Sequence, residues 1–382
     1  MNQLNRLLLV VSVFFSVLIS SVQAQDSSHL RISLLTCSPG DELYSTFGHT
    51  AIRIVDSSST NDIVFNYGTF DFDDPSFYMK FIRGKLMYYL SAEDFQIFKQ
   101  DYQLTNRGIT EQLLNLSAAE KIELTEALYN NIKIENRYYK YDFFFDNCTI
   151  RPRDLLQKYK ANFPAFKQVM PKGTRFRQAI HQYLDQRNKH WSKLGIDILL
   201  GAPTDAVMTN AQSLFLPDNL MKAIDSSSVV ASTQAVYPFN ETANKAGFFT
   251  PLMSFFLLLV LIITLTRNGN AFVASVLLGF DGLLFFLTGA LGVVLIFMWT
   301  ATDHSMCKNN FNLLWAWPTH LIGAFLINST KRWAKFYFGI TTVLYSLLLL
   351  VWFFLPQQLN IALIPIVLII LYRSALKYFR KS

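Results

Sequence analysis

The sequence is organised around Phe143-Phe-Phe-Asp-Asn-Cys-Thr-Ile-Arg-Pro-Arg-Asp154. Asp146 and Asn147 are good helix N-caps, and Pro152 is tolerated in a first helical turn, so this stretch predicts a helix that begins at Cys148. A cysteine in the first turn lies at the positive end of the helix dipole, which favours the thiolate. Because the thiolate is the nucleophilic form, this position suits covalent catalysis. A buried structural cysteine is the alternative.

A cysteine nucleophile needs a base, and His49 is the best candidate. It opens the apolar run Ala51-Ile-Arg-Ile-Val55, which predicts a strand. A second predicted strand forms a hairpin with it and carries Asn66 and Tyr67, either of which could orient the imidazole as the third group of a catalytic triad does. The sequence does not fix the strand register, so both stay open. The alternative for His49 is a half-buried strand histidine.

Two residues near His49 are candidates for binding a substrate. Tyr44 precedes the tight turn at Gly48, and Arg53 lies on the same predicted strand as His49. Arg53 suits a phosphate or a carboxylate ligand, but an ion pair within the protein explains it equally well. The aromatic residues of 138–145 either line an acyl-chain groove or pack in the core.

Composition changes abruptly along the 382 residues. Charged residues make up 16% of the chain, against roughly 25% in soluble domains. Residues 1–24 carry a basic residue, an apolar run and a Val-Gln-Ala cleavage site, which predict a signal peptide and an exported domain at 25–224. The net charge of +7 includes no long basic run, so no nucleic-acid partner is expected. The three cysteines have no metal-ligand spacing, so we expect no metal and no cofactor; a disulfide between Cys37 and Cys307 stays open.

Five apolar blocks follow a polar linker predicted at 225–246, and they predict an all-α transmembrane domain with five helices at 247–372. Most of the blocks approach the roughly 20 residues that span a bilayer; they are 248–265, 271–299, 311–327, 336–355 and 359–372. If the N-terminal domain is outside, nearly all basic residues of the links, and the tail at 373–382, fall inside. The positive-inside rule therefore supports a multi-pass protein with a cytoplasmic basic tail.

The link at 300–310 is predicted to lie outside, in the same compartment as Cys148. It is dense in polar residues, and we expect Asp303, His304 and Asn309 to help bind a substrate at the mouth of the thiol domain; an ordinary solvated loop is the alternative. Asp281 lies within the second apolar block. A carboxylate in the membrane is costly, so it has a role, is protonated, or pairs with a neighbouring helix.

The exported domain has the pattern of an α+β fold. Strands are predicted at 30–36, 51–55, 63–67 and 109–114, and helices after capping boxes at 91–94 and 117–120 and near 174–186 and 217–223. A histidine on a strand, followed much later by a cysteine at a helix start, is the order of permuted papain-like folds. The sequence therefore predicts a permuted papain-like domain followed by a five-helix membrane domain.

Several motifs resemble the signatures of the Lnb family. They are Tyr44-Ser-Thr-Phe-Gly-His-Thr-Ala-Ile-Arg53, Phe65-Asn-Tyr-Gly-Thr-Phe70, Asp146-Asn-Cys-Thr-Ile-Arg-Pro-Arg-Asp154, Trp191-Ser-Lys-Leu-Gly-Ile-Asp197, Leu200-Gly-Ala-Pro-Thr-Asp205 and Phe215-Leu-Pro-Asp218. The Asn-Cys pair at a helix start is also similar to the lecithin:retinol acyltransferase-like (LRAT-like) and NlpC/P60-like thiol enzymes.

The resemblance implies a lipoprotein N-acyltransferase of the bacterial inner (cytoplasmic) membrane, with its catalytic domain in the periplasm. Cys148 would be the nucleophile and His49 the base. The partners would be a phospholipid acyl donor and a diacylglyceryl lipoprotein whose α-amine accepts the chain. Two other functions stay open: a membrane-tethered thiol hydrolase of peptidoglycan peptides or lipid esters, and a non-catalytic lipid-binding sensor or scaffold.

Overall fold

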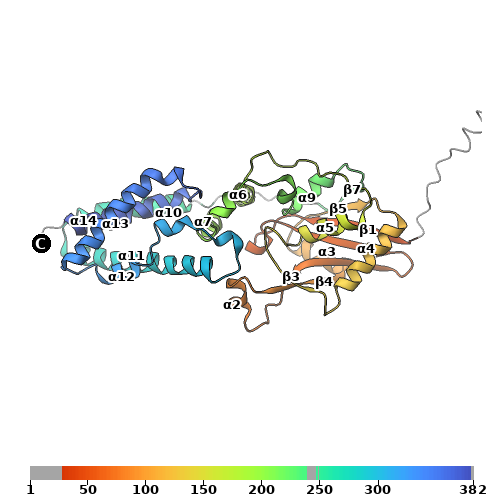
Figure 1. The fold of residues 1–382 in the computed structure, drawn as a ribbon, viewed down its shortest axis with the longest axis horizontal. Helices are drawn as coiled ribbons and strands as arrows, with labels where there is room; N and C mark the ends of the chain where they lie inside the picture. The colour runs from red at the N-terminus through yellow and green to blue at the C-terminus, as the bar shows by residue number, and fades with distance from the viewer. Residues whose placement is uncertain (1–27, 239–246, 248, 380–382) are drawn as a thin grey trace, which may run out of the picture.

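The computed structural model describes residues 28–238, 247 and 249–379. The molecule is elongated, with a β-sheet domain at one end and a helical bundle at the other (Figure 1). The sheet domain lies before residue 238 and the bundle after residue 249. The predicted signal peptide at 1–24 lies outside the described residues.

The N-terminal domain is built on a seven-stranded antiparallel sheet in the order β6-β4-β3-β2-β1-β5-β7. The four predicted strands are β1, β2, β3 and β5, and β2–β3 is the predicted hairpin. The bounds are β1 Leu30–Cys37, β2 His49–Asp56, β3 Asn61–Thr69, β4 Met87–Asp94, β5 Ile109–Leu114, β6 Tyr138–Lys140 and β7 Val230–Tyr237.

Successive strand residues point to opposite faces of the sheet, and both faces carry apolar side chains. Helices therefore cover both faces. On one face Ile32 and Leu34 pack against α4 (Ala118–Asn131), α5 (Ile150–Tyr159) and α9 (Pro217–Ile224). On the other face Leu35 and Ala51 pack against α3 (Phe95–Leu104). The predicted capping box of Ser117 and Glu120 is present at the start of α4. The domain is therefore an antiparallel sheet between helices.

The capping box predicted at 91–94 is wrong. These residues complete β4, where the Ser91 hydroxyl lies 2.7 Å from that of Thr69 on β3. Asp94 caps α3 by accepting a hydrogen bond from the N–H of Gln96 at 2.7 Å. Pairing with a neighbouring strand therefore prevails over the local capping pattern.

The linker predicted at 225–246 also differs from the structure. Its residues Val230–Tyr237 form β7, which pairs with β5 at the edge of the sheet. The sheet domain thus extends beyond the predicted boundary at residue 224. Residues 239–246 lie outside the described part of the chain.

The C-terminal region contains four apolar helices: α10 (Pro251–Thr266), α11 (Ala271–Thr300), α13 (Arg332–Val351) and α14 (Ile364–Phe379). Among the described residues, three segments are long and apolar enough to cross a membrane: Ala271–Thr300, Arg332–Phe354 and Ile361–Phe379. The helix α10, with 16 residues, is shorter. The predicted third block is not a continuous helix, because it forms η4 (Phe311–Leu314) and the short α12 (His320–Phe325).

This broken segment nevertheless runs the length of the bundle. At one end the Asn310 side chain donates to the carbonyl of Ile198 in the sheet domain at 2.8 Å. At the other end the Lys377 ammonium donates to the carbonyl of Ile327 at 3.2 Å. Residues 310–327 therefore run from the sheet-domain end of the bundle to its far end without forming a continuous helix, and five membrane crossings stay a prediction.

Close packing against α11 explains how the irregular segment at 310–327 is accommodated. A Cβ on Gly289 would lie 2.3 Å from the backbone nitrogen of Leu321, and one on Gly292 would lie 2.2 Å from the carbonyl oxygen of Ala316. The carbonyl of Trp315 accepts a hydrogen bond from the Tyr345 hydroxyl. Irregular backbone at membrane depth is tolerated where protein covers it, as it does here.

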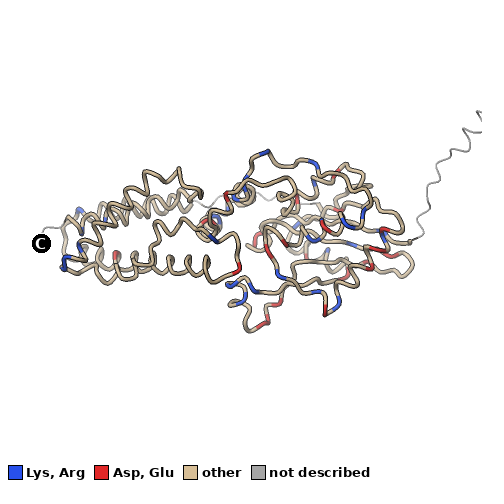
Figure 2. The backbone as a smooth tube through the Cα atoms, in the orientation of Figure 1, with Lys and Arg blue, Asp and Glu red and all other residues tan. Residues whose placement is uncertain are grey.

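Asp281 is fully buried in α11 and is paired, which is one of the predicted alternatives. Its two carboxylate oxygens accept from the Arg373 guanidinium at 2.6 and 2.8 Å, and Lys377 lies at 3.2 Å. Lys and Arg gather at the end of the bundle farthest from the sheet domain (Figure 2). The predicted tail at 373–382 is helical as far as Phe379, so its first residues belong to the bundle.

Candidate functional site

The loop before α5 places Cys148 at the start of a helix. The helix α5 begins at Ile150, two residues later than predicted, and its N-cap is Thr149. The side-chain oxygen of Asn147 accepts the N–H groups of Thr149 and Ile150, both at 2.9 Å, in the turn that leads into the helix. Its side-chain nitrogen donates to the carbonyl of Phe215 at 2.8 Å, which holds the loop against the neighbouring segment. Cys148 itself is half-buried. The thiol is therefore fixed in position and still open to a substrate.

The helix start is tied to β2, where His49 begins the strand. The hydroxyls of Thr149 and Thr50 lie 3.1 Å apart in the buried contact between the two elements. The Cys148 sulfur has hydrogen bonds with the His49 side chain and with the backbone N–H of Thr50. The structure thus brings together the predicted nucleophile and base.

Asn66, rather than Tyr67, is the partner of His49. The Asn66 side-chain oxygen lies 3.1 Å from His49 Nε2, while the Tyr67 hydroxyl donates to Asn131 at 2.5 Å. The Asn66 side-chain nitrogen donates to Glu93 on β4 at 2.8 Å. A carboxylate only accepts, so Glu93 fixes the orientation of the amide, and the amide oxygen in turn fixes a proton on Nε2. This leaves Nδ1 of His49 to take the Cys148 proton.

The electrostatics favour a thiolate beside an imidazolium. Burial raises the pKa of Cys148, but the charge of His49 and the hydrogen bonds from His49 and Thr50 outweigh it, so this pKa lies below its usual value. Burial lowers the pKa of His49, but the charge of Cys148 and the hydrogen bonds to Cys148 and Asn66 outweigh it, so that pKa is raised. Shifts of opposite sign are typical of a catalytic nucleophile and its base.

The other two cysteines have the opposite character. Both are buried, and no disulfide joins any of the three. Burial, which outweighs the hydrogen bond from Tyr102, raises the pKa of Cys37 to about 12. Burial, with a smaller contribution from Asp142, raises the pKa of Cys307 to about 11. Of the three cysteines, Cys148 is thus the one whose thiolate forms most readily.

Two glycines keep the backbone close around the site. Gly48, at φ +83°, comes directly before His49, and a Cβ there would lie 2.7 Å from the carbonyl of Cys37. Gly68, at φ +94°, follows Asn66 in an irregular part of β3, and a Cβ there would lie 3.5 Å from that of Cys148. The motifs quoted around residues 44–53 and 65–70 therefore shape the two sides of the thiol.

The structure favours the ion-pair alternative for Arg53. Its guanidinium donates twice to Asp62, at 2.7 and 2.6 Å, and once to Glu111 at 3.1 Å, and it lies 3.4 Å from the centre of the Phe95 ring. Tyr44 projects from η1 (Leu43–Ser45) with 74% of its surface exposed. Substrate contact by Tyr44 stays a prediction.

The link at 300–310, which we call the outer link, docks on the sheet domain. Asp303 pairs with Lys140 at 2.6 Å, and His304 Nε2 lies 3.0 Å from the carbonyl of Phe81. The carbonyl of Asn309 accepts the N–H of Ala202 at 3.1 Å. These contacts hold the link near the segment that leads to Cys148. Substrate binding by Asp303, His304 and Asn309 stays a prediction.

A buried polar junction, which sequence reasoning missed, joins the two domains. Arg177 on α6 (Phe176–Gln186) is fully buried and donates to Asp197 on α7 (His190–Leu199) at 2.8 Å and to Asp205 in η2 (Ala202–Asp205) at 3.1 Å. Asp197 also accepts from Asn360 of the bundle at 2.8 Å, and Gln357 donates to the carbonyl of Leu200 at 2.9 Å. Two of the motifs quoted above, at 191–197 and 200–205, supply this junction.

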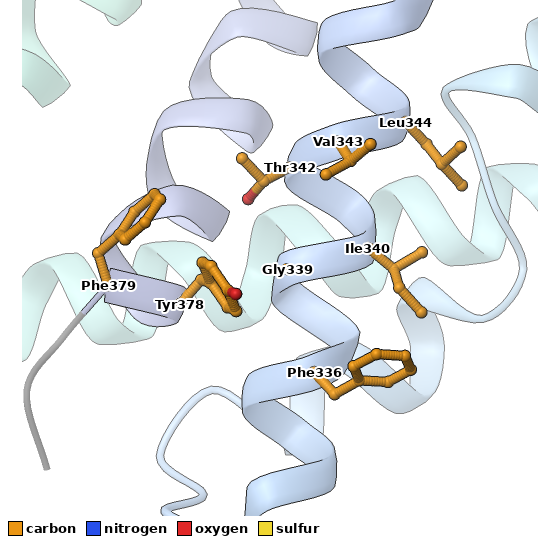
Figure 3. A pocket seen from close by; sticks show the side chains of 8 residues that line it. All are labelled: Phe336, Gly339, Ile340, Thr342, Val343, Leu344, Tyr378 and Phe379. Atoms are coloured by element: carbon orange, nitrogen blue, oxygen red, sulfur yellow. The ribbon is translucent and has the colours of Figure 1, made fainter.

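A groove of about 410 Å³ lies between α13 and α14 (Figure 3). Gly339 and Tyr378 face each other there, and a Cβ on Gly339 would lie 2.8 Å from the Tyr378 ring. The adjacent residue Lys377 contacts the end of the bundle away from the sheet domain. This groove is therefore remote from Cys148 and is not part of the candidate active site.

Two family models match the chain. The Lnb N-terminal periplasmic domain matches residues 22–183, and the Lnb transmembrane domain matches residues 243–382. No curated protein and no solved structure was found to match. The first match covers the part of the sheet domain that holds His49, Asn66, Glu93 and Cys148, and the second covers the helical bundle. The chain therefore belongs to the Lnb family, as a membrane protein with a periplasmic N-terminal domain.

Proposed function

We propose that this protein is a lipoprotein N-acyltransferase that moves an acyl chain from a phospholipid to the α-amine of a diacylglyceryl-cysteine. The observation that carries the proposal is the chain of contacts Cys148–His49–Asn66, on a domain docked to a membrane bundle. A helix-borne cysteine against an antiparallel sheet that bears the histidine is also the arrangement of permuted papain-like thiol enzymes, which supports a covalent route.

In the first half-reaction the Cys148 thiolate attacks the ester carbonyl of a phospholipid. A carbon–sulfur bond forms and the ester carbon–oxygen bond breaks. His49, which holds the proton taken from the thiol, gives it to the departing oxygen, so a lysophospholipid leaves. The backbone N–H of Thr50, which has a hydrogen bond with the Cys148 sulfur, is our candidate for stabilising the oxyanion, because the N–H groups of Thr149 and Ile150 already donate to Asn147.

In the second half-reaction the lipoprotein α-amine attacks the thioester. A carbon–nitrogen bond forms, the carbon–sulfur bond breaks, and His49 takes the proton that the amine loses. The sulfur leaves as the thiolate and His49 keeps the proton, which restores the starting pair of thiolate and imidazolium. The sequence of steps needs no cofactor. Water in place of the amine would make the same site a thiol hydrolase.

The membrane bundle supports the transferase over the hydrolase. Both proposed substrates are anchored in a bilayer, and the buried junction at Arg177 holds the thiol domain on the bundle. A peptidoglycan hydrolase would need only a single anchor. We place the protein in the inner membrane, with Cys148 on the periplasmic side.

Mass spectrometry of a lipoprotein's N-terminal peptide tests the proposal. In a strain that lacks this protein, expression of the unsubstituted (parent) protein should restore the N-acyl chain on the lipoprotein. Expression of Cys148→Ala or His49→Ala should not restore it. Cys307→Ala serves as the matched control, because Cys307 is a buried thiol in the outer link. Full N-acylation by Cys148→Ala would exclude the covalent route, and release of free fatty acid with no N-acylation by the parent would indicate a hydrolase.

A further inference from the structure

The helix α2 (Phe77–Ile82) turns an apolar face away from the protein. Tyr78 is 77% exposed, and Met79, Phe81 and Ile82 are also among the exposed large apolar side chains. Of the residues in this helix, only Phe77 is buried. Such a concentration of exposed aromatic and aliphatic surface marks an interaction site.

The position of α2 in the molecule indicates what covers this face. The carbonyl of Arg83, just after α2, accepts the N–H of Asp303 at 3.0 Å, and the carbonyl of Phe81 lies 3.0 Å from His304 Nε2. These two link residues follow almost directly after α11, which ends at Thr300. Figure 1 shows α2 where the bundle meets the sheet domain. The helix is thus level with the outer end of a membrane-spanning helix.

Aromatic side chains continue from α2 toward the thiol. The Phe77 ring lies 5.8 Å from that of Phe70, which lies 5.3 Å from that of Tyr88. The Tyr88 ring stacks on that of Tyr141 at 4.3 Å. Tyr141 and Cys148 lie on the same side of Gly68, since a Cβ on that glycine would be 3.6 Å from one and 3.5 Å from the other. A continuous aromatic path therefore joins α2 to the nucleophile.

We propose that α2 lies in the outer headgroup region of the bilayer, with Tyr78, Met79 and Ile82 among the lipids. The aromatic path from Phe77 to Tyr141 then guides the acyl chain of a phospholipid to Cys148; this second part rests on the proposed function. Aromatic residues favour the membrane interface. Arg83 and Lys85, which follow the helix, suit the phosphates of lipid headgroups because long basic side chains reach from the interface.

Spin labels measure the depth of α2 directly. The full-length protein, with Cys148→Ser, would carry a label at Met79→Cys or at Ile97→Cys in vesicles of phosphatidylethanolamine and phosphatidylglycerol. Ile97 is the matched control, because it is 56% exposed on α3 of the sheet domain. We expect the label at position 79 to collide more with oxygen and less with a water-soluble nickel complex than the label at 97. Equal collision rates at positions 79 and 97 would overturn the proposal. Dipolar coupling between labels at position 79 of two molecules would also overturn it, because a second copy of the protein would then cover this face.

An acylation assay tests the path. Met79→Asp should slow acylation of Cys148 by vesicle phospholipids about tenfold, since it loses the burial of a large apolar side chain. It should leave acylation by a water-soluble short-chain ester unchanged, because the thiol is intact; Ile97→Asp should change neither rate. If vesicle phospholipids acylate Cys148 of Met79→Asp as fast as that of the unsubstituted protein, the path is refuted. If the soluble ester acylates the parent but phospholipids do not, the proposed function fails while the depth measurement still stands.

Discussion

The contact between Asn66 and His49 gives the sharpest mechanistic prediction. Asn66→Ala removes a 3.1 Å hydrogen bond to His49 Nε2 and the 2.8 Å hydrogen bond that links the pair to Glu93. A hydrogen bond to a charged group contributes about 1.5–3 kcal/mol, and about 1.4 kcal/mol is a factor of ten. We therefore expect the rate of Cys148 acylation to fall ~10- to 100-fold.

The sign of the accompanying pH effect follows from the same contact. The hydrogen bond to Asn66 raises the pKa of His49, and the charge of His49 lowers the pKa of Cys148. Losing the bond lowers the pKa of His49, which weakens the ion pair and raises the pKa of Cys148. The thiolate then forms at higher pH, so the acidic limb of the pH–rate profile should move to higher pH.

The assay is the acylation of Cys148 by a water-soluble ester, followed as the mass gain of the intact protein over time and across pH. Tyr67→Phe is the control, because the Tyr67 hydroxyl contacts Asn131 and not His49. It should keep the parental rate and profile. If Asn66→Ala is as fast as the parent with the same pH dependence, Asn66 does not orient the base. If Tyr67→Phe is the slower variant, Tyr67 and not Asn66 orients the base.

Iodoacetamide should modify Cys148 before the two buried cysteines at neutral pH. His49→Ala should slow the modification of Cys148, because losing the imidazolium raises the pKa of the thiol. Equal modification rates in the unsubstituted protein and in His49→Ala would exclude the ion pair. A reporter fused to the C-terminus should be active in the cytoplasm if the predicted five crossings follow an exported domain, and periplasmic activity would contradict that count. Arg373→Leu should lower the free energy of unfolding by about 3 kcal/mol, because the buried carboxylate of Asp281 loses both hydrogen bonds from the guanidinium and keeps only Lys377 at 3.2 Å. Thermal unfolding in detergent measures this loss, and Asp281→Leu in the same protein should recover most of it.

The sequence predicted the parts of the site that depend on local signals. Cys148 follows cap residues and His49 opens an apolar strand, and both signals lie within a few residues of the side chain concerned. Glu93 was missed because Ser91-Ala-Glu-Asp94 has the pattern of a capping box. Only pairing with β3 makes these residues a strand, and that pairing is a tertiary property.

Two differences in the fold have similar causes. The strand β7 is mostly exposed and has no alternation of apolar and polar residues, so the pairing with β5 gives no pattern in the sequence. The segment 311–327 is apolar enough to be predicted as a helix. Its break depends on Gly289 and Gly292 of another helix, which allow its backbone to approach. Composition predicts where a chain meets lipid, but not which backbone it adopts there.

The Arg177 junction has a consequence for kinetics. With the sheet domain fixed to the bundle, Cys148 keeps a constant height above the bilayer plane while the whole protein diffuses laterally. If the proposed function holds, the acyl donor and the acceptor lipoprotein reach Cys148 by two-dimensional diffusion in the membrane. The turnover rate would then depend on the number of substrate molecules per unit of membrane area, and not on their concentration in the periplasm. Diluting the lipoprotein with inert lipid at constant bulk concentration would then slow the enzyme, whereas diluting the vesicles with buffer would not.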